Sequence, residues 1–155
     1  MKRALLTIAI LSLFFIYAYA ESKEKSEELN WLTNLEEAQQ IAKEKGLPIL
    51  IDFTGSDWCG WCIKLVDEIF SQQKFIEYAA GNLILVKLDF PKDIHQTEET
   101  KTYNRQLAEK YNIRGFPTII LIDAQGNEIA RTGYQYGGAG NYIEHLKSLI
   151  DNKEK

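Results

Sequence analysis

The sequence predicts an α/β domain in which a mixed central β-sheet carries helices on both faces. Apolar runs of strand length alternate with amphipathic runs of helical length, and a turn-rich stretch near the end favours a β-hairpin. Of the 155 residues, 45% are hydrophobic and 26% are charged, a composition that supports one ordinary globular core.

Residues 1–20 have the composition of a cleavable secretory signal peptide. Lys2 and Arg3 form a basic start, an almost wholly apolar run follows, and small residues occupy the positions that determine cleavage after Ala20. The alternative is an uncleaved membrane anchor through residues 4–20, a length near the lower limit for crossing a bilayer. We therefore expect an exported chain.

Residues 21–28 are polar and charged, so we expect a flexible leader before a folded domain of residues 29–155. The formal net charge of the full sequence is −4. A nucleic-acid-binding surface needs a basic patch, so this acidic balance argues against a nucleic-acid partner.

The first helix is predicted to start at a capping box formed by Thr33 and Glu36 and to stop at Gly46. Pro48 then keeps the chain from continuing as a helix. Between these signals, apolar residues repeat at helical spacing: Leu35, Ala38, Ile41 and Ala42.

Residues 47–53 are short and almost continuously apolar, as expected of a central strand covered on both faces, with Asp52 as the exception. A turn with the two cysteines follows, and an apolar stripe over residues 63–70 predicts the second helix. After a break at residues 71–73, helical spacing continues to Gly81.

Residues 83–89 predict a second buried strand, and the helical crossover before it is long enough for parallel pairing. Residues 90–102 are polar and lack periodicity, so we expect a surface excursion there. The third helix then ends near Tyr111, and one of its faces is formed by Tyr103, Leu107, Ala108 and Tyr111.

The last part of the sheet is predicted to be a hairpin. Residues 118–123 form a third strand, residues 124–127 have turn composition, and residues 128–132 return as the fourth strand.

The final helix is predicted to begin at Asn141, where Asn141-x-x-Glu144 forms a capping signal. Residues 137–140 are rich in Gly but lack the Lys-Ser/Thr end of a phosphate-binding loop. We interpret them as a turn before this helix.

Cys59 and Cys62 are the only cysteines, and they stand where a strand gives way to a helix. The free N–H groups and positive dipole end of that helix favour a thiolate on Cys59. A purely structural disulfide is the weaker interpretation, because so short a loop removes little entropy from the unfolded chain. The pair predicts thiol–disulfide exchange in which Cys59 attacks a substrate disulfide and Cys62 resolves the mixed disulfide.

Three stretches of residues 29–150 resemble the thioredoxin superfamily: Ile51-Asp52-Phe53 leading to Trp58-Cys59-Gly60-Trp61-Cys62, Lys87-Leu88-Asp89, and Ile113-Arg114-Gly115-Phe116-Pro117-Thr118. The run around the cysteines also resembles exported thioredoxin-like proteins of the chlamydial DsbH type. The resemblance implies a thioredoxin fold, a periplasmic protein-disulfide reductase or isomerase, and a cis peptide bond between Phe116 and Pro117.

The sequence departs from ordinary thioredoxins at three places. Trp61 replaces the proline usual between the cysteines, one extra residue separates Asp52 from Cys59, and residues 90–102 form a longer connection. We expect the first two differences to affect the redox potential and the third to create a partner surface specific to the subfamily.

Asp52 is the candidate proton acceptor for Cys62, because the resemblance places a buried acid at this position. A carboxylate in an apolar strand is unfavourable unless it has a partner or a function, and Lys87 is its expected partner. The alternative is that Asp52 points outward at the end of the sheet.

Aromatic residues around the thiols are candidates for an apolar platform on which an extended substrate lies against the backbone before Pro117. The alternative is that they belong to the core or are merely exposed. The predicted substrate-binding residues are Trp58, Gly60, Trp61, Phe116, Pro117 and Tyr134.

Neither residue between the cysteines is cationic, and Asp57 lies two residues before Cys59. Only the helix end and Lys64 are then available to stabilise the thiolate. We predict a moderately reducing couple with a Cys59 pKa of about 7, as in thioredoxin.

No cofactor is expected beyond the redox-active pair Cys59 and Cys62, and no metal site. Ile63 stands where haem attachment would need His, and the two histidines, His95 and His145, lie in distant segments. The competing function is a thioredoxin-shaped binding module or a Cu(I) metallochaperone, which the shortage of soft ligands disfavours.

The expected partners are disulfide-containing exported proteins and an outside electron donor, because the chain has no second dithiol. A membrane thiol transporter of the DsbD or CcdA kind is the natural donor. The sequence shows no dimerisation domain, so we expect a monomer.

Overall fold

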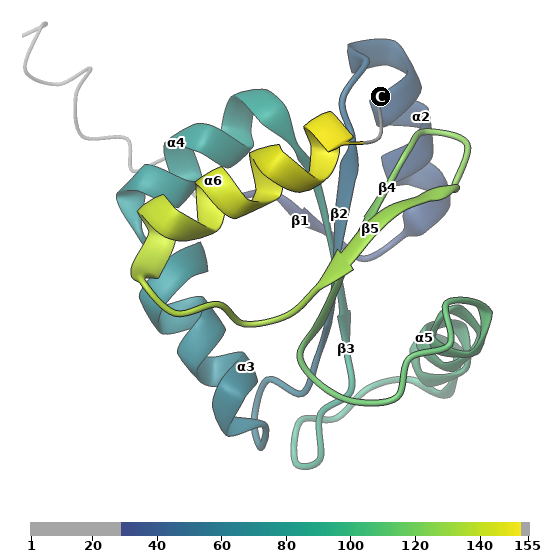
Figure 1. Cartoon of the computed structure of the whole chain (residues 1–155). Helices are drawn as coiled ribbons and strands as arrows, with labels where there is room; N and C mark the ends of the chain where they lie inside the picture. The colour runs from purple at the N-terminus through teal and green to yellow at the C-terminus, as the bar shows by residue number, and fades with distance from the viewer. Residues whose placement is uncertain (1–28, 153–155) are drawn as a thin grey trace, which may run out of the picture.

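Five strands form the central sheet: β1 (Trp31–Leu32), β2 (Ile49–Thr54), β3 (Ile84–Asp89), β4 (Thr118–Ile122) and β5 (Glu128–Thr132). Their spatial order is β1-β3-β2-β4-β5 in this computed structural model (Figure 1). β1, β3 and β2 run parallel, whereas β4 is antiparallel to both β2 and β5. The predicted mixed sheet with a terminal hairpin is confirmed.

The structure describes residues 29–152. The predicted signal peptide and leader, the alternative membrane anchor and the last three residues of the domain lie outside this part. No helix between residues 29 and 152 is long and apolar enough to span a bilayer.

Helices cover both faces of the sheet, as the sequence predicts (Figure 1). One core joins Leu50 of β2 to the layer of α3, η1, α4 and α6, and the other joins Ile51 of β2 to α2 and α5. The helical segments are α2 (Leu35–Lys45), α3 (Gly60–Leu65), η1 (Val66–Phe70), α4 (Gln73–Asn82), α5 (Glu98–Lys110) and α6 (Gly138–Asp151).

Strand β2 lies at the centre of the sheet, and all six of its residues are buried. Because side chains alternate along a strand, Asp52 shares a face with Leu50 and therefore points toward the layer of α3 and α6. This places a carboxylate beneath the helix that carries the cysteines.

The helix predicted over residues 63–70 consists of two segments. α3 starts at Gly60, and η1 continues it as a π-helix in which the Ser71 N–H donates to the Val66 carbonyl at 2.9 Å. Only the second half of the predicted apolar stripe is buried, because Ile69 and Phe70 lie in the core whereas Ile63 and Val66 are exposed. A π-turn uses one extra residue per turn, and sequence spacing did not reveal it.

Three predicted helix starts are wrong by a few residues. The N-cap of α2 is Asn34, whose side chain accepts from the Glu37 N–H at 2.7 Å, and not Thr33. α5 begins at Glu98 because Thr97 caps it, so the end of the predicted excursion over residues 90–102 is helical.

The start of α6 also differs from the prediction. The helix begins at Gly138 after Gly137 adopts a left-handed conformation, so most of the predicted turn over residues 137–140 is the first turn of the helix. The predicted cap at Asn141 therefore lies inside α6. β1 was not predicted because two residues carry no periodicity.

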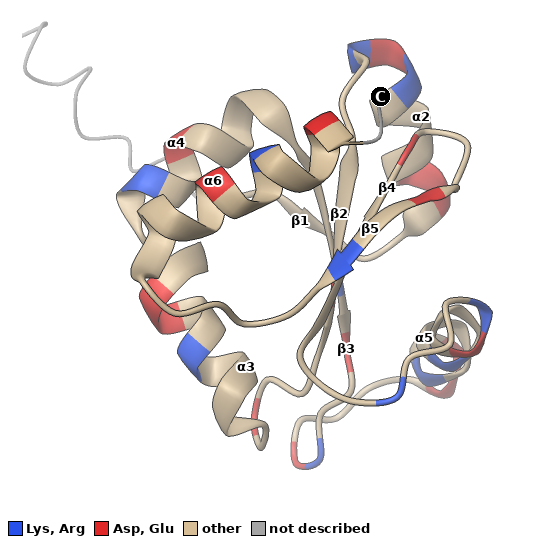
Figure 2. Cartoon of the chain, viewed as in Figure 1, with Lys and Arg blue, Asp and Glu red and all other residues tan. Residues whose placement is uncertain are grey.

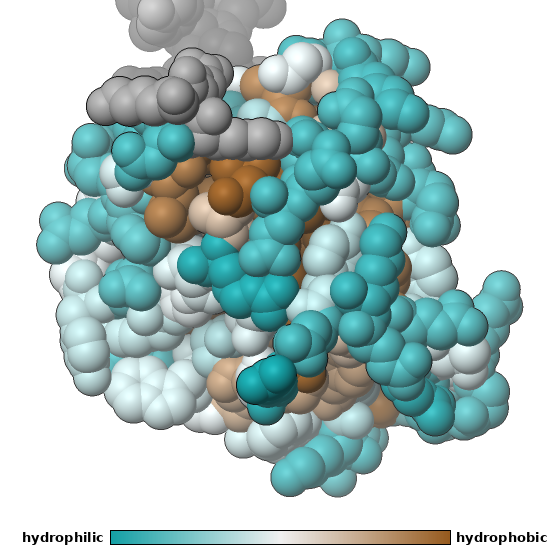
Figure 3. Space-filling model, turned by 45° about the vertical axis from the view of Figure 1, so that its right-hand side comes forward, coloured by the Kyte–Doolittle hydropathy of each residue, from teal (hydrophilic) through white to brown (hydrophobic). Residues whose placement is uncertain are grey.

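Charged residues of both signs alternate along α2 and α5, whereas the middle of the sheet is almost free of them (Figure 2). The space-filling view shows hydrophilic residues over most of one face, with hydrophobic residues in small separate patches (Figure 3). The apolar residues are thus used mainly inside the two cores.

Candidate active site

The cysteine turn joins the end of β2 to the start of α3. Cys59 is the N-cap of α3, and its sulfur accepts a hydrogen bond from the Cys62 N–H at 3.2 Å. The two cysteines form a disulfide. A sulfur at this position faces the positive end of the helix dipole, which stabilises a thiolate when the disulfide is reduced.

The two sulfur-bearing residues differ little in exposure. Cys59 is 7% exposed and Cys62 is 1% exposed in the disulfide state. Cys59 is the more accessible of the two, but in this state it is buried rather than open to solvent.

Gly55 and Ser56 set the shape of the turn before the cysteines. The Gly55 carbonyl accepts from the Cys59 N–H at 2.9 Å. A Cβ built on Gly55 would lie only 2.6 Å from the nearest atom of the Trp58 indole. Ser56 donates through its N–H and its hydroxyl to the carboxylate of Asp89. Glycine is therefore required at position 55 for the ring to pack here.

Asp52 is buried, with 1% exposure, so the alternative in which it points outward does not hold. Its Oδ1 has no hydrogen-bond partner among residues 29–152. Burial raises the pKa of Asp52 to about 7, while the charge of Lys87 opposes this shift and that of Asp89 adds to it. The carboxyl group is thus poised to exchange a proton near neutral pH.

Lys87 lies opposite Asp52 in the parallel pairing of β2 and β3. No ion pair shorter than 4.0 Å joins the two side chains within residues 29–152, so Lys87 acts on Asp52 through space. Both residues line a pocket of about 230 Å³ beside Cys62, whose other walls are Thr54, Ser56, Ile63, Val66 and Asp67.

The Phe116–Pro117 peptide bond is cis, as the resemblance implied. The Thr118 hydroxyl donates to the Gly115 carbonyl at 2.7 Å, which closes the turn into β4. A Cβ on Gly133 would lie 3.3 Å from the Pro117 carbonyl oxygen, so Gly133 lets the next strand approach this turn closely.

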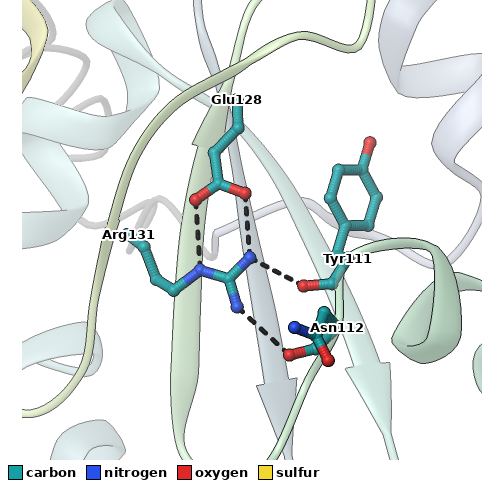
Figure 4. A network of polar contacts seen from close by, with 4 residues as sticks. All are labelled: Tyr111, Asn112, Glu128 and Arg131. Carbon is teal, nitrogen blue, oxygen red and sulfur yellow. Dashed lines mark hydrogen bonds and ion pairs between the residues drawn. The ribbon is translucent and has the colours of Figure 1, made fainter.

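Arg131 anchors the other end of the segment that leads to Pro117 (Figure 4). Its guanidinium donates to the Tyr111 carbonyl at 2.6 Å and the Asn112 carbonyl at 3.4 Å, while Glu128 holds it through two further bonds. No local sequence pattern links β5 to the end of α5, so this clamp was not predicted.

Trp58 and Phe116 form one aromatic group on the Cys59 side of the turn. Their ring centres are 5.9 Å apart in an edge-on arrangement, and Phe90 stacks on Phe116 at 5.1 Å. The indole N–H of Trp58 donates to the Phe90 carbonyl at 2.8 Å, and Trp58 remains 40% exposed. Phe90 was not among the predicted site residues.

Trp61 and Tyr134 form a second group, with ring centres 5.3 Å apart, and Tyr136 joins both rings. The Lys64 ammonium lies 5.4 to 5.7 Å from the three ring centres and 3.5 Å from Glu68, whose carboxylate also accepts from the Tyr134 hydroxyl. These contacts engage Lys64, the residue expected to stabilise the Cys59 thiolate.

The predicted platform of four aromatic residues is therefore two separate groups. Gly60, the remaining predicted contact, is exposed at the first position of α3, and nothing lies within 4 Å of a Cβ built there. Packing alone does not require glycine at this position.

The site contains a disulfide at the start of α3 and the buried acid Asp52 beneath it. It also contains the cis-proline turn, in which Phe116 contacts Trp58. Among residues 29–152, no group of three or more His, Cys, Asp or Glu side chains could hold a metal ion. Together the fold and the cysteine pair define a thiol–disulfide oxidoreductase with the thioredoxin fold.

The chain belongs to the thioredoxin-like domain family, whose sequence model matches residues 35–148. It is 41% identical over 114 residues to the Disulfide bond reductase DsbH of Chlamydia pneumoniae, and the match covers 74% of this chain and 69% of that protein. A solved structure named DsbH Oxidoreductase superposes with a TM-score of 0.76 at 40% identity, covering 80% of this chain and 85% of that one.

The chain is also 33% identical over 128 residues to the Thioredoxin-related protein DsbJ of Chlamydia pneumoniae. That match covers 83% of this chain but only 37% of DsbJ. These similarities confirm the resemblance to the DsbH type that the cysteine run predicted.

Proposed function

We propose that this protein reduces disulfide bonds in exported proteins, with Cys59 as the attacking thiolate and Cys62 as the resolving thiol. The observation that carries the proposal is the hydrogen bond from the Cys62 N–H to the Cys59 sulfur at the start of α3. A donor aimed at this sulfur stabilises a negative charge on it. The similarity to a named disulfide reductase supports the direction of the reaction.

In the reduced protein, the Cys59 thiolate attacks one sulfur of a substrate disulfide and breaks the substrate S–S bond. The other substrate sulfur leaves as a thiolate and takes a proton from solvent. Cys62 then loses its proton and attacks the Cys59 sulfur, which forms the Cys59–Cys62 disulfide and releases the second substrate sulfur as a thiolate that takes a proton from solvent. Two electrons pass from the protein dithiol to the substrate.

Asp52 is proposed to take the proton from Cys62 in the second step. It is buried, lines the same pocket as Cys62, and has a pKa raised to about 7, which suits a group that accepts and releases a proton near neutral pH. Lys87, opposite it in the sheet, favours the charged carboxylate and so limits the rise in pKa.

The substrate is proposed to lie against Trp58, Phe116 and the cis-proline turn, because these groups are contiguous on the Cys59 side. Pro117, Gly60, Trp61 and Tyr134 complete the proposed contact surface. An extended polypeptide fits a site that offers aromatic faces beside a turn of backbone.

Each turnover oxidises the dithiol, so the protein needs an outside electron donor. Within the Dsb redox pathway to which the similarity points, we propose a membrane thiol transporter of the DsbD or CcdA kind as this donor. Residues 1–20 are proposed to direct a monomeric protein to the periplasm, with no cofactor other than its own dithiol.

The proposal is tested by reduction of insulin disulfides by the mature protein with dithiothreitol as the electron source, using Cys59→Ser as the control. We expect turbidity from precipitated insulin chains to develop with the native protein and not with the variant. Equal rates for the two proteins, together with tight Cu(I) binding by the native protein, would favour the metallochaperone function instead.

A further inference from the structure

Residues 90–94 form a wall beside the cysteine turn, and one carboxylate holds the middle of this wall. Asp57 accepts hydrogen bonds from the N–H groups of Lys92 at 2.9 Å, Asp93 at 2.7 Å and Ile94 at 3.1 Å. Hydrogen bonds to a charged group are about twice as strong as neutral ones. The bond from Lys92, followed by those from Asp93 and Ile94, lowers the pKa of Asp57, so this carboxylate is ionised at neutral pH.

The wall has little other support in its middle. Within residues 29–152, no backbone–backbone hydrogen bond involves residues 91–96. Its beginning is fixed by the Phe90 N–H, which donates to the Thr54 carbonyl at 2.8 Å, and its end by the cap of α5. Asp57 is therefore the group that determines where residues 92–94 lie.

Trp58, the residue after Asp57, is attached to the same wall. Its indole N–H donates to the Phe90 carbonyl, and the ammonium of Lys92 lies 4.3 Å from the centre of its ring. The Trp58 ring also packs so closely against Gly55 that a Cβ there would overlap it. The position of the wall and the orientation of the tryptophan next to Cys59 are thus coupled.

Aromatic contacts join the wall to the cis-proline turn. Phe90 stacks on Phe116, whose own peptide bond to Pro117 is cis, and Trp58 contacts Phe116 edge-on. At the tip of the wall, the apolar side chain of Ile94 is 56% exposed. The Ile94 N–H donates to Asp57, two residues before Cys59, so an extended polypeptide bound at Cys59 is long enough to cover this apolar side chain, whereas a small disulfide is not.

We propose that residues 90–94 are a substrate-binding wall, and that Asp57 is the positioning residue that gives the enzyme its preference for protein disulfides flanked by an apolar side chain. This inference rests on the proposed function. The occupant is an extended polypeptide, and its apolar residue beside the cysteine packs against Ile94 and the ring of Trp58. Asp57 takes no part in the exchange of bonds between the sulfurs.

The test compares kcat and KM of Asp57→Ala for two disulfide-linked peptides, one with Leu and one with Ser beside the cysteine, and for the small disulfide 5,5′-dithiobis(2-nitrobenzoate). We expect the KM for the Leu peptide to rise about tenfold, as when an interface anchor is lost, with kcat and the small-disulfide KM changed by about twofold or less. Ile94→Ser should raise the KM for the Leu peptide in the same way while leaving the Asp57 carboxylate in place.

Glu99→Ala is the control, because it also replaces a carboxylate by Ala, on the exposed first turn of α5 beyond the wall, where the side chain of Glu99 makes no hydrogen bond or ion pair with residues 29–152. It should leave all three KM values unchanged. If Asp57→Ala and Ile94→Ser alter the Leu and Ser peptides alike, or alter neither, the proposed wall is wrong. If the native protein reduces none of the three disulfides, the proposed function itself fails.

Discussion

On the Cys59 side of the disulfide, polar groups are paired with the backbone: Asp57 with three N–H groups, and Trp58 with the Phe90 carbonyl. On the Cys62 side, Asp52 is buried, lines a pocket of about 230 Å³, and has an oxygen without a hydrogen-bond partner among residues 29–152. Satisfied hydrogen bonds fix geometry, whereas an unsatisfied buried acid shifts its pKa toward neutrality. This difference agrees with the proposal that the first side positions a substrate and the second moves a proton.

The two tryptophans follow the same division. Trp58 is oriented by a hydrogen bond and a close contact with Gly55, while Trp61 is held by rings and by the ammonium of Lys64. Contacts of the second kind are individually weaker at an exposed site. Trp61, at 50% exposure, is therefore free to adapt to different partners more readily than Trp58.

The largest expected difference between the two sides is between the cysteines themselves. Cys59→Ser should lower the rate of insulin reduction by about 10³-fold or more, because the nucleophile is lost. Cys62→Ser should still attack but should accumulate a mixed disulfide with the substrate, detectable by mass spectrometry. A mixed disulfide found on Cys62 in the Cys59→Ser variant at the same yield would reverse the assignment of roles.

Asp52→Asn should affect only the resolving step. The carboxylate form accepts the proton, so the native rate of resolution should rise as the pH increases through about 7, and the variant should lack this rise and be about 100-fold slower at pH 8. Single-turnover decay of a preformed mixed disulfide measures this step. Asp67→Asn, on the exposed wall of the same pocket, is the control, and an equal loss there would contradict a specific role for Asp52.

The same substitution should stabilise the protein at high pH. The pKa of Asp52 is raised from 3.8 to about 7 in the folded state. The free energy of unfolding therefore falls as the pH rises from about 4 to 7, and the loss is complete above pH 7. Asp52→Asn should therefore raise the free energy of unfolding at pH 8 by up to about 4 kcal/mol, with little effect at pH 3. Urea unfolding at both pH values checks this, and a stability gain independent of pH would contradict it.

The smallest expected effects distinguish the two tryptophans. Trp58→Ala should raise the KM for insulin about fivefold, because its ring links the substrate wall to Phe116, whereas Trp61→Ala should raise it about twofold. Steady-state kinetics of the two variants under the same conditions measure the difference. A larger effect for Trp61 would show that substrates bind mainly on the Cys62 side.

The sequence was sufficient for the parts of this protein that local pattern determines. The alternation of apolar and amphipathic runs predicted the mixed sheet, and the position of the cysteines between β2 and α3 predicted the redox pair. The cis bond before Pro117 was predicted through resemblance alone and is present. These features depend on residues that are close together in the chain or on motifs with one known geometry.

The features that sequence did not predict depend on contacts between distant segments. Asp57 was considered only as a charge near Cys59, because its bonds to residues 92–94 cross 35 residues or more. The clamp of Arg131 on the end of α5 joins residues 19 and 20 positions apart, again without a local signal.

The most direct test of the division between the two cysteines is alkylation of the fully reduced protein with iodoacetamide as a function of pH, with the modified residue identified by mass spectrometry. We predict that Cys59 is modified first, with an apparent pKa of about 7, and that Cys62 remains protected until the protein unfolds. Modification of both cysteines at the same rate, or of Cys62 first, would contradict this division.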